Sequence, residues 1–166
     1  MSVSLMAGCA LLCAGVVAGH VQPAESDVRP EAGLQDLRIL DMADGILLNE
    51  SHWLPSGDRD CELDAPSHNL FCALAYANAY TLGEYQHRAA AMQAVRFAIE
   101  EQVDISGYQH RLMDYNNADG RQFSEIKDVI RMARCDITEQ LLENGTLTKA
   151  EAEFILNTRD PAASAD

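Results

Sequence analysis

Three side chains of types that commonly do chemistry, one imidazole and two carboxylates, flank the apolar stretches of this 166-residue sequence. His68 stands at the start of an uncharged run, Glu100 near the end of an alanine-rich run, and Asp114 in a polar segment. Brought into one cleft, such a trio could carry out acid–base chemistry on a polar substrate. His68 and Asp114 could also bind a divalent metal, which is the one cofactor that these residue types suggest. His68, Glu100 and Asp114 are therefore the candidate catalytic residues.

The same side chains also have a purely structural interpretation. His68 could hydrogen-bond Asp114, while Asn117 and Gly120 shape a turn that ties a loop to the core. Buried polar networks of this kind can fix a fold without performing catalysis. The small number of ligand-type residues in the sequence favours this structural hypothesis.

A calcium loop is a separate hypothesis for the second polar segment. Residues 114–125 (DYNNADGRQFSE) resemble an EF-hand loop, with Asp in the first place and Glu in the twelfth. The glycine required in the sixth place is Asp119 here, and Gly120 comes one position late. The fifth place is Ala118, which offers no side-chain ligand, so the match is incomplete.

Five segments carry apolar residues at spacings of three and four, the period of an amphipathic helix. They cover residues 34–48, 67–82, 84–103, 124–143 and 148–157. Ser67 is the expected N-cap of the second helix, Gly83 is expected to end it, and Thr148 opens a capping box for the last helix. The second segment has no formal charge after His68, so we expect it at the centre, paired with the third segment as an αα-hairpin.

Alternating polar and apolar residues, the pattern of strands, do not persist anywhere in the sequence. The sequence therefore predicts an all-α fold, a small bundle of about four to five helices around a central apolar helix. Residues 49–66 are expected to form a loop that Trp53 pins to the core, and residues 104–120 are expected to be irregular.

The order of the polar residues resembles an uncharacterised helical domain family of bacterial secreted and polymorphic-toxin-type proteins. Its pattern is Asp-Ala-Phe-Arg-His-Ala, a spaced Gly, Ala-His-Glu, and Met-Asp-x-x-Asn-Asn-x-x-Gly-Arg. The matching positions are Asp64, His68, Gly83, Ala98, Glu100, Asp114, Asn117, Gly120 and Arg121. The resemblance thus adds Asp64, Asn117, Gly120 and Arg121 as binding or structural residues.

Two positions depart from the pattern of that family. Ser67 stands where the family has Arg, and Ile99 stands where it has a second His. If relatives use both histidines to bind a metal or as an acid–base pair, this chain retains only one of the two. The departures favour a divergent, non-catalytic copy.

The first 24 residues contain no Asp, Glu, Lys or Arg. Their apolar run, residues 5–19, is too short for a spanning helix and suits a signal peptide, although the first four residues lack the usual positive charge. Cys9 follows Met6-Ala7-Gly8, which approaches a lipoprotein box. We expect a leader at 1–24, a flexible arm at 25–33, a helical domain at 34–158 and a disordered tail at 159–166. The mature protein would be exported, periplasmic or secreted, without a transmembrane span, and lipoprotein anchoring is the alternative.

Three cysteines remain after the expected leader, at positions 61, 72 and 135. In an oxidising compartment they suggest one disulfide and one remaining thiol, and three pairings are open. Cys72 lies in an apolar helical run, so a buried thiol outside the disulfide is its simplest interpretation.

Charge composition narrows the classes of partner. Asp and Glu number 26 against 12 for Lys and Arg, which gives a net charge of −14. This balance repels phosphate backbones and anionic lipid headgroups, so no nucleic acid partner is expected. A protein partner or a polar small molecule is compatible with it, as is a cationic ligand.

The sequence lacks the motifs of the well-marked enzyme classes. It has no Gly-rich phosphate loop, no G-x-S-x-G, no H-E-x-x-H and no paired C-x-x-C. Two hypotheses remain. The first is an exported, non-enzymatic periplasmic binding or partner protein; the alternative is a secreted hydrolase-like effector with a metal-dependent or metal-free His/Glu/Asp cleft.

Overall fold

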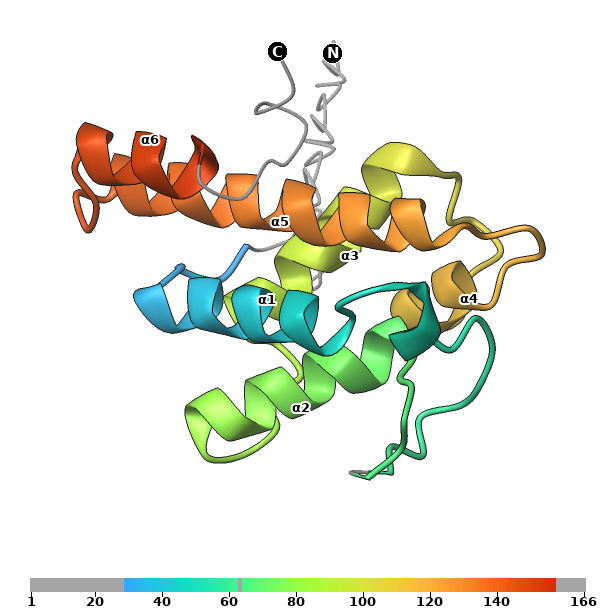
Figure 1. The fold of residues 1–166 in the computed structure, drawn as a ribbon. Helices are drawn as coiled ribbons and strands as arrows, with labels where there is room; N and C mark the ends of the chain where they lie inside the picture. Colours follow the sequence, from blue (N-terminus) through green and yellow to red (C-terminus); the bar gives the residue numbers. More distant parts are fainter. Residues whose placement is uncertain (1–28, 63, 158–166) are drawn as a thin grey trace, which may run out of the picture.

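The computed structural model describes residues 29–62 and 64–157 (Figure 1). Within these ranges the chain forms six α-helices, one 3₁₀ turn and no strand, which confirms the all-α prediction. The elements are α1 (Leu34–Ile46), η1 (Glu50–His52), α2 (Leu70–Leu82), α3 (Ala90–Gln102), α4 (Arg111–Asn116), α5 (Phe123–Glu143) and α6 (Lys149–Asn157). None of these helices is long and apolar enough to cross a membrane. The expected leader and tail, and residues 25–28 of the expected arm, lie outside the described residues.

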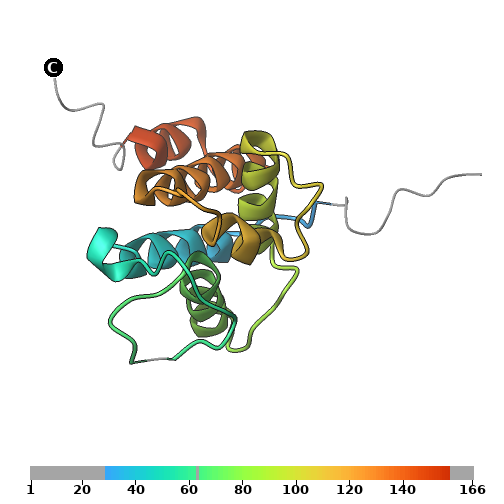
Figure 2. The same cartoon turned by 90° about the vertical axis from the view of Figure 1, so that its right-hand side faces the viewer.

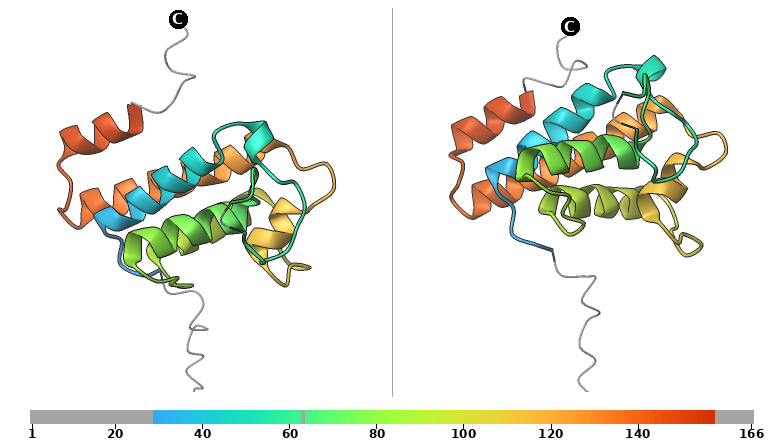
Figure 3. Two further views of the ribbon diagram at one scale, coloured as in Figure 1. Left: turned by 60° about the horizontal axis from the view of Figure 1, so that its bottom comes forward. Right: turned by 90° about the horizontal axis from the view of Figure 1, so that it is seen from below.

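Helix α1 lies between α2 on one side and α5 on the other (Figures 1 and 3). α3 packs against α5, and α6 folds back along the end of α5. The short α4 contacts α2 and α3 and closes one end of the bundle (Figure 2). The apolar stripes of α1, α3 and α5 face one another and form the core, which buries the large side chains Ile39, Leu40, Met92, Ile99, Ile126, Ile130 and Ile137.

The predicted αα-hairpin of the second and third helices is wrong. α2 packs chiefly on α1, whereas α3 packs chiefly on α5. α3 begins at Ala90 rather than at residue 84, because the buried amide of Asn78 holds the connection in a non-helical path. Asn78 Oδ1 accepts from the backbone N–H of Gln86 (2.7 Å), and Nδ2 donates to the Gln86 carbonyl (3.3 Å). The connection carries the chain across to the other side of α1.

Asp36 ties α1 to the start of α3. Its side chain is only 3% exposed. Oδ1 accepts from the backbone N–H of Ala91 (2.8 Å), and Oδ2 accepts from the backbone N–H of Gly33 (3.0 Å). One carboxylate thus satisfies donors at the N-termini of two helices, where the helix dipole favours negative charge.

The N-cap of α2 is Asn69, not Ser67 as predicted. The Asn69 side chain accepts from the backbone N–H of Cys72 (2.8 Å). The helix cannot begin earlier because the His68 backbone pairs with the preceding loop. The His68 N–H donates to the His52 carbonyl, and the His68 carbonyl accepts from the N–H of Leu54, both at 2.9 Å.

The buried amide of Asn116 joins three parts of the chain. Its Oδ1 accepts from the indole Nε1 of Trp53 (2.8 Å) and from the backbone N–H of Leu70 (3.0 Å). Its Nδ2 donates to the Leu54 carbonyl (3.0 Å) and to the side chain of Asn117 (3.1 Å). Asn116 lies in α4, a helix within residues 104–120, so the prediction that this whole stretch is irregular is wrong. The predicted pinning of the loop by Trp53 is confirmed, and Asn116 is the group that receives it.

A disulfide joins Cys61 to Cys72, with the two Cα atoms 5.4 Å apart. The expectation of one disulfide is confirmed, but the interpretation of Cys72 as an unpaired thiol is wrong. Cys135 lies partly buried on α5 and takes no part in this disulfide. The bond fastens the loop before α2 to the first turn of that helix, and disulfides of this kind typically contribute on the order of 2–4 kcal/mol.

We predict that Asn116→Ala lowers the free energy of unfolding by about 3 kcal/mol. The substitution leaves the Trp53 indole, the Leu70 N–H and the Leu54 carbonyl without a partner, and each such buried group costs roughly 1–3 kcal/mol. The matched control is Asn117→Ala, which removes bonds of a more exposed side chain and is expected to cost about 1 kcal/mol or less. Urea denaturation of both variants measures the difference. Equal losses would contradict the role given to Asn116.

Candidate functional site

Four of the twelve Lys and Arg side chains of this acidic protein line a single cleft of about 340 Å³. The cleft lies among the loop before α2, the segment joining α2 to α3, and α4, and we call it the arginine cleft. No Asp or Glu is among the residues that line it within the described chain: Arg59, Phe71, Tyr85, His87, Arg88, Gln93, Arg96, Gln109, His110, Arg111, Leu112 and Met113. Its lining is thus opposite in sign to the net charge of the chain.

Arg96 is the most unusual charge in the arginine cleft, because its side chain is only 8% exposed. Nη1 donates to the carbonyl oxygen of His87 (2.9 Å), and Nη2 lies 3.2 Å from Nδ1 of the same residue. Within residues 29–62 and 64–157, no carboxylate pairs with Arg96. Burial therefore lowers the pKa of its guanidinium, although the neighbouring Tyr85 acts in the opposite direction. A buried cation with only neutral partners is unfavourable unless an anion reaches it.

His87 lies among the positive charges of the arginine cleft. Desolvation lowers the pKa of its imidazole, and the positive charges of Arg96, Arg88 and Arg59 lower it further. The imidazole is therefore neutral at pH 7, with Nδ1 available as an acceptor for Arg96. The cationic character of the cleft thus comes from its guanidinium groups.

Part of the arginine cleft is apolar. The rings of Phe71 and Tyr85 meet edge to face, with centroids 6.1 Å apart and planes at 71°. Leu112 and Met113, on α4, add aliphatic surface. The cleft therefore combines guanidinium donors with apolar side chains.

Glu100 and Asp114, two of the predicted catalytic residues, support the walls of the arginine cleft. Glu100 forms an ion pair with Arg111. Asp114 Oδ2 accepts from the backbone N–H groups of Gln109 (2.6 Å) and His110 (2.7 Å), which precede α4. Both carboxylates thus have partners that fix neighbouring cleft residues in place.

His68, the third predicted catalytic residue, lines a different cleft of about 390 Å³. That cleft is acidic, with Asp58, Asp60 and Glu62 among its lining. The His68 ring packs edge to face on Tyr76, with centroids 5.3 Å apart, and burial lowers its pKa. The hydrogen bond between His68 and Asp114 that the structural hypothesis expected does not form, and within the described chain no hydrogen bond or ion pair joins His68 to Glu100 either. The described residues also hold no group of three His, Cys, Asp or Glu side chains that could bind a metal.

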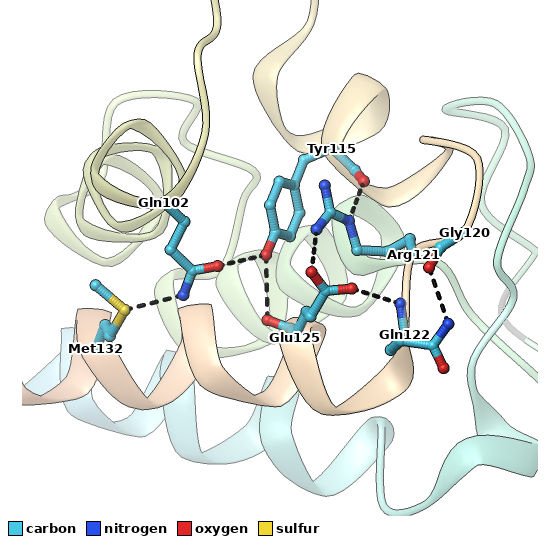
Figure 4. A network of polar contacts seen from close by, with 7 residues as sticks. All are labelled: Gln102, Tyr115, Gly120, Arg121, Gln122, Glu125 and Met132. Atoms are coloured by element: carbon cyan, nitrogen blue, oxygen red, sulfur yellow. Dashed lines mark hydrogen bonds and ion pairs between the residues drawn. The ribbon is translucent and has the colours of Figure 1, made fainter.

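Arg121 and Gly120 belong to a polar network that joins α4 to α5 (Figure 4). The Arg121 guanidinium stacks 3.7 Å from the ring centre of Tyr115, donates to the Tyr115 carbonyl (2.9 Å) and pairs with Glu125 (2.7 Å). Burial of the Tyr115 ring raises the pKa of its phenol to about 12. Gly120 has φ +77, a left-handed conformation that favours glycine. Here these residues serve the fold.

The EF-hand-like interpretation of residues 114–125 is wrong. Asp114 lies within α4, and Glu125 lies in the first turn of α5, where it accepts from Arg121 and from the N–H of Gln122 (2.7 Å). The carboxylates at both ends of the proposed loop therefore already have protein partners, since Asp114 accepts from the backbone N–H groups of Gln109 and His110.

Asp64 and Asn117 lie in the surface loops around the His68 cleft. Asn117 Nδ2 donates to the Gly57 carbonyl (2.8 Å) and so holds the loop before α2. Desolvation raises the pKa of the Tyr76 phenol, and the negative charges of the exposed Asp64 and of Glu62 raise it further. Both contacts are consistent with structural roles.

The arginine cleft was missed by the sequence analysis because its basic residues are dispersed. Arg59 lies in a loop, Arg88 in another, Arg96 on α3 and Arg111 at the start of α4. No spacing in the sequence connects them. The sequence offers one signal, because Arg96 falls among the apolar residues on one face of the third predicted helix.

A family model described as a family of unknown function (DUF6197) matches residues 31–135, and the chain belongs to this family. The match contains the whole arginine cleft and all the predicted site residues. Comparisons with curated proteins and with solved structures give no match.

We predict that Arg96→Gln raises the pKa of His87. The substitution removes a positive charge that disfavours the imidazolium form, and it removes the donor that faces Nδ1. Imidazole chemical shifts in an NMR titration measure this pKa. Arg131→Gln, at an exposed arginine on α5 paired with Asp128, is the matched control and leaves it unchanged. A His87 pKa that is the same in both variants would contradict the electrostatics described.

Proposed function

We propose that this member of a family of unknown function is a non-enzymatic binding protein that takes a small anion into the arginine cleft. The observation that carries the proposal is the buried Arg96 guanidinium, which has no carboxylate partner in the described chain. A bound oxyanion would supply the missing negative charge. Arginine is suited to this task because its planar fork makes two parallel hydrogen bonds to a carboxylate or phosphate.

The surrounding electrostatics support the same proposal. Arg59 and Arg88 lower the pKa of His87, which means that their charges act on the same small volume as Arg96. A cleft with one sign of charge and low-dielectric walls concentrates its field and attracts counter-ions. The net charge of −14 does not oppose this, since exposed charges farther than about 8 Å are largely screened at physiological salt.

The engagement of the predicted catalytic residues favours binding over catalysis. Glu100 is paired with Arg111, and Asp114 already accepts two backbone N–H bonds. A general base needs a lone pair within reach of substrate, and the contacts of these carboxylates hold Arg111 and the backbone before α4. The imidazole ring of His68 lies in the acidic cleft, beside carboxylates that would repel an anionic substrate.

Export is part of the proposal. The apolar, uncharged residues 1–24 suit a secretory leader, and the Cys61–Cys72 disulfide suits an oxidising compartment such as the periplasm. An affiliation with polymorphic-toxin-type proteins rests on the motif resemblance alone, and anion binding does not require it.

The test is an NMR titration of the domain with sodium phosphate at constant ionic strength. We expect a saturable shift of the His87 imidazole signals, with a raised pKa, because the bound anion offsets the nearby guanidinium charges. Arg59→Ala weakens the binding, and Arg131→Gln leaves it unchanged. A His87 response that grows linearly without saturation, or one that is equal in the wild type and Arg59→Ala, would contradict anion binding in this cleft.

A further inference from the structure

We infer that the ligand of the arginine cleft is an amphiphilic organic anion, one carboxylate or phosphate group attached to an aromatic or aliphatic body. This inference rests on the proposed anion binding and specifies its substrate class. It is carried by the placement of apolar side chains in the same cleft as the guanidinium groups. An inorganic ion would use only the charged half of that lining.

The apolar half of the cleft is built by three elements. Phe71 comes from the first turn of α2, Tyr85 from the segment after α2, and Leu112 with Met113 from α4. The edge-to-face arrangement of Phe71 and Tyr85 is a favourable geometry for aromatic rings, and it fixes their relative position. Small-molecule sites typically combine such apolar walls with a few convergent polar groups.

The charged half lies within the same volume. Arg96 on α3 donates a hydrogen bond to the carbonyl oxygen of His87. The neighbouring Tyr85 raises the pKa of the Arg96 guanidinium, and the Tyr85 ring packs against Phe71 in the apolar wall. The Tyr85 hydroxyl lies 3.3 Å from Nδ1 of His87, so the ring that borders the apolar part also reaches the cationic part. A ligand with its anionic end at Arg96 would therefore place an attached body against Tyr85 and Phe71.

The size of the cleft limits the ligand. A volume of about 340 Å³ falls at the lower end of the range for small-molecule sites, which is roughly 300–1,000 Å³. A nucleic acid or another extended polyanion would meet the acidic remainder of the protein surface, and the net charge of −14 disfavours that contact. A compact monoanion or dianion fits both constraints.

The guanidinium group of arginine donates paired hydrogen bonds to carboxylate and to phosphate groups alike, so ligands with both head groups need to be compared. The experiment measures dissociation constants by isothermal titration calorimetry for phenyl phosphate and inorganic phosphate, and for benzoate and acetate. Benzyl alcohol serves as the uncharged control. We expect the aromatic member of at least one pair to bind ten-fold or more tightly than its small partner, and benzyl alcohol not to bind detectably.

Variants separate this inference from the proposed function. Phe71→Ala is expected to remove most of the ten-fold preference for the aromatic anion over its small partner. Arg59→Ala is expected to weaken both members of each pair. Leu142→Ala, at an exposed leucine on α5 outside the cleft, is the matched control for loss of an apolar side chain and changes neither.

The outcomes distinguish two failures. Equal affinity for aromatic and small anions, both sensitive to Arg59→Ala, would overturn the inference about the organic body and keep anion binding. Absence of binding by all four anions would overturn both. Binding of benzyl alcohol as tight as that of benzoate would show an apolar site without a role for the guanidinium groups, and would also overturn both.

Discussion

The carboxamide of Asn116 is the constraint on which the functional end of this fold depends. It is fully buried, and its oxygen accepts one hydrogen bond from the loop before α2 and one from the start of α2. Its nitrogen donates one hydrogen bond to the same loop and one to the neighbouring Asn117. Because Asn116 belongs to α4, these bonds fix α4 against α2. Both helices contribute to the arginine cleft, so the amide sets the distance between two of its walls.

The disulfide and the Asn69 cap extend this constraint along the loop before α2. Cys61 is joined to Cys72, and Asn69 Nδ2 donates to the carbonyl of Asp58 (2.9 Å). Between these two anchors lies Arg59, which lines the arginine cleft, while Asp58 and Asp60 line the acidic cleft around His68. Consecutive residues of one anchored loop thus place opposite charges in two separate clefts, which explains how a strongly acidic chain can present a cationic site.

Much of the fold was predictable because local physics decides it. The three- and four-residue spacing gave the helices, the left-handed Gly83 ends α2, and the Thr148 capping box forms as expected. Helix pairing was not predictable in the same way. It depends on Asn78 and Asp36, whose side chains face inward and direct the chain from α2 to α3.

The site was less accessible to sequence reasoning than the fold. Glu100 and Asp114 were singled out as catalytic, and the structure places them beside the arginine cleft, where they hold Arg111 and the residues before α4. The net charge of −14 is compatible with a cationic ligand and gives no sign of a cationic cleft, because a sum over the chain cannot show where the charges converge. That convergence arises only when Arg59 and Arg96 are brought together by tertiary contacts.

The most direct test of this account is a crystal structure of the protein grown with phenyl phosphate. The account predicts a phosphate group within hydrogen-bond distance of Arg96 or Arg59, with the phenyl ring against Phe71 and Tyr85. Phenyl phosphate bound in the His68 cleft, or an arginine cleft filled only by ordered water at a saturating ligand concentration, would contradict it.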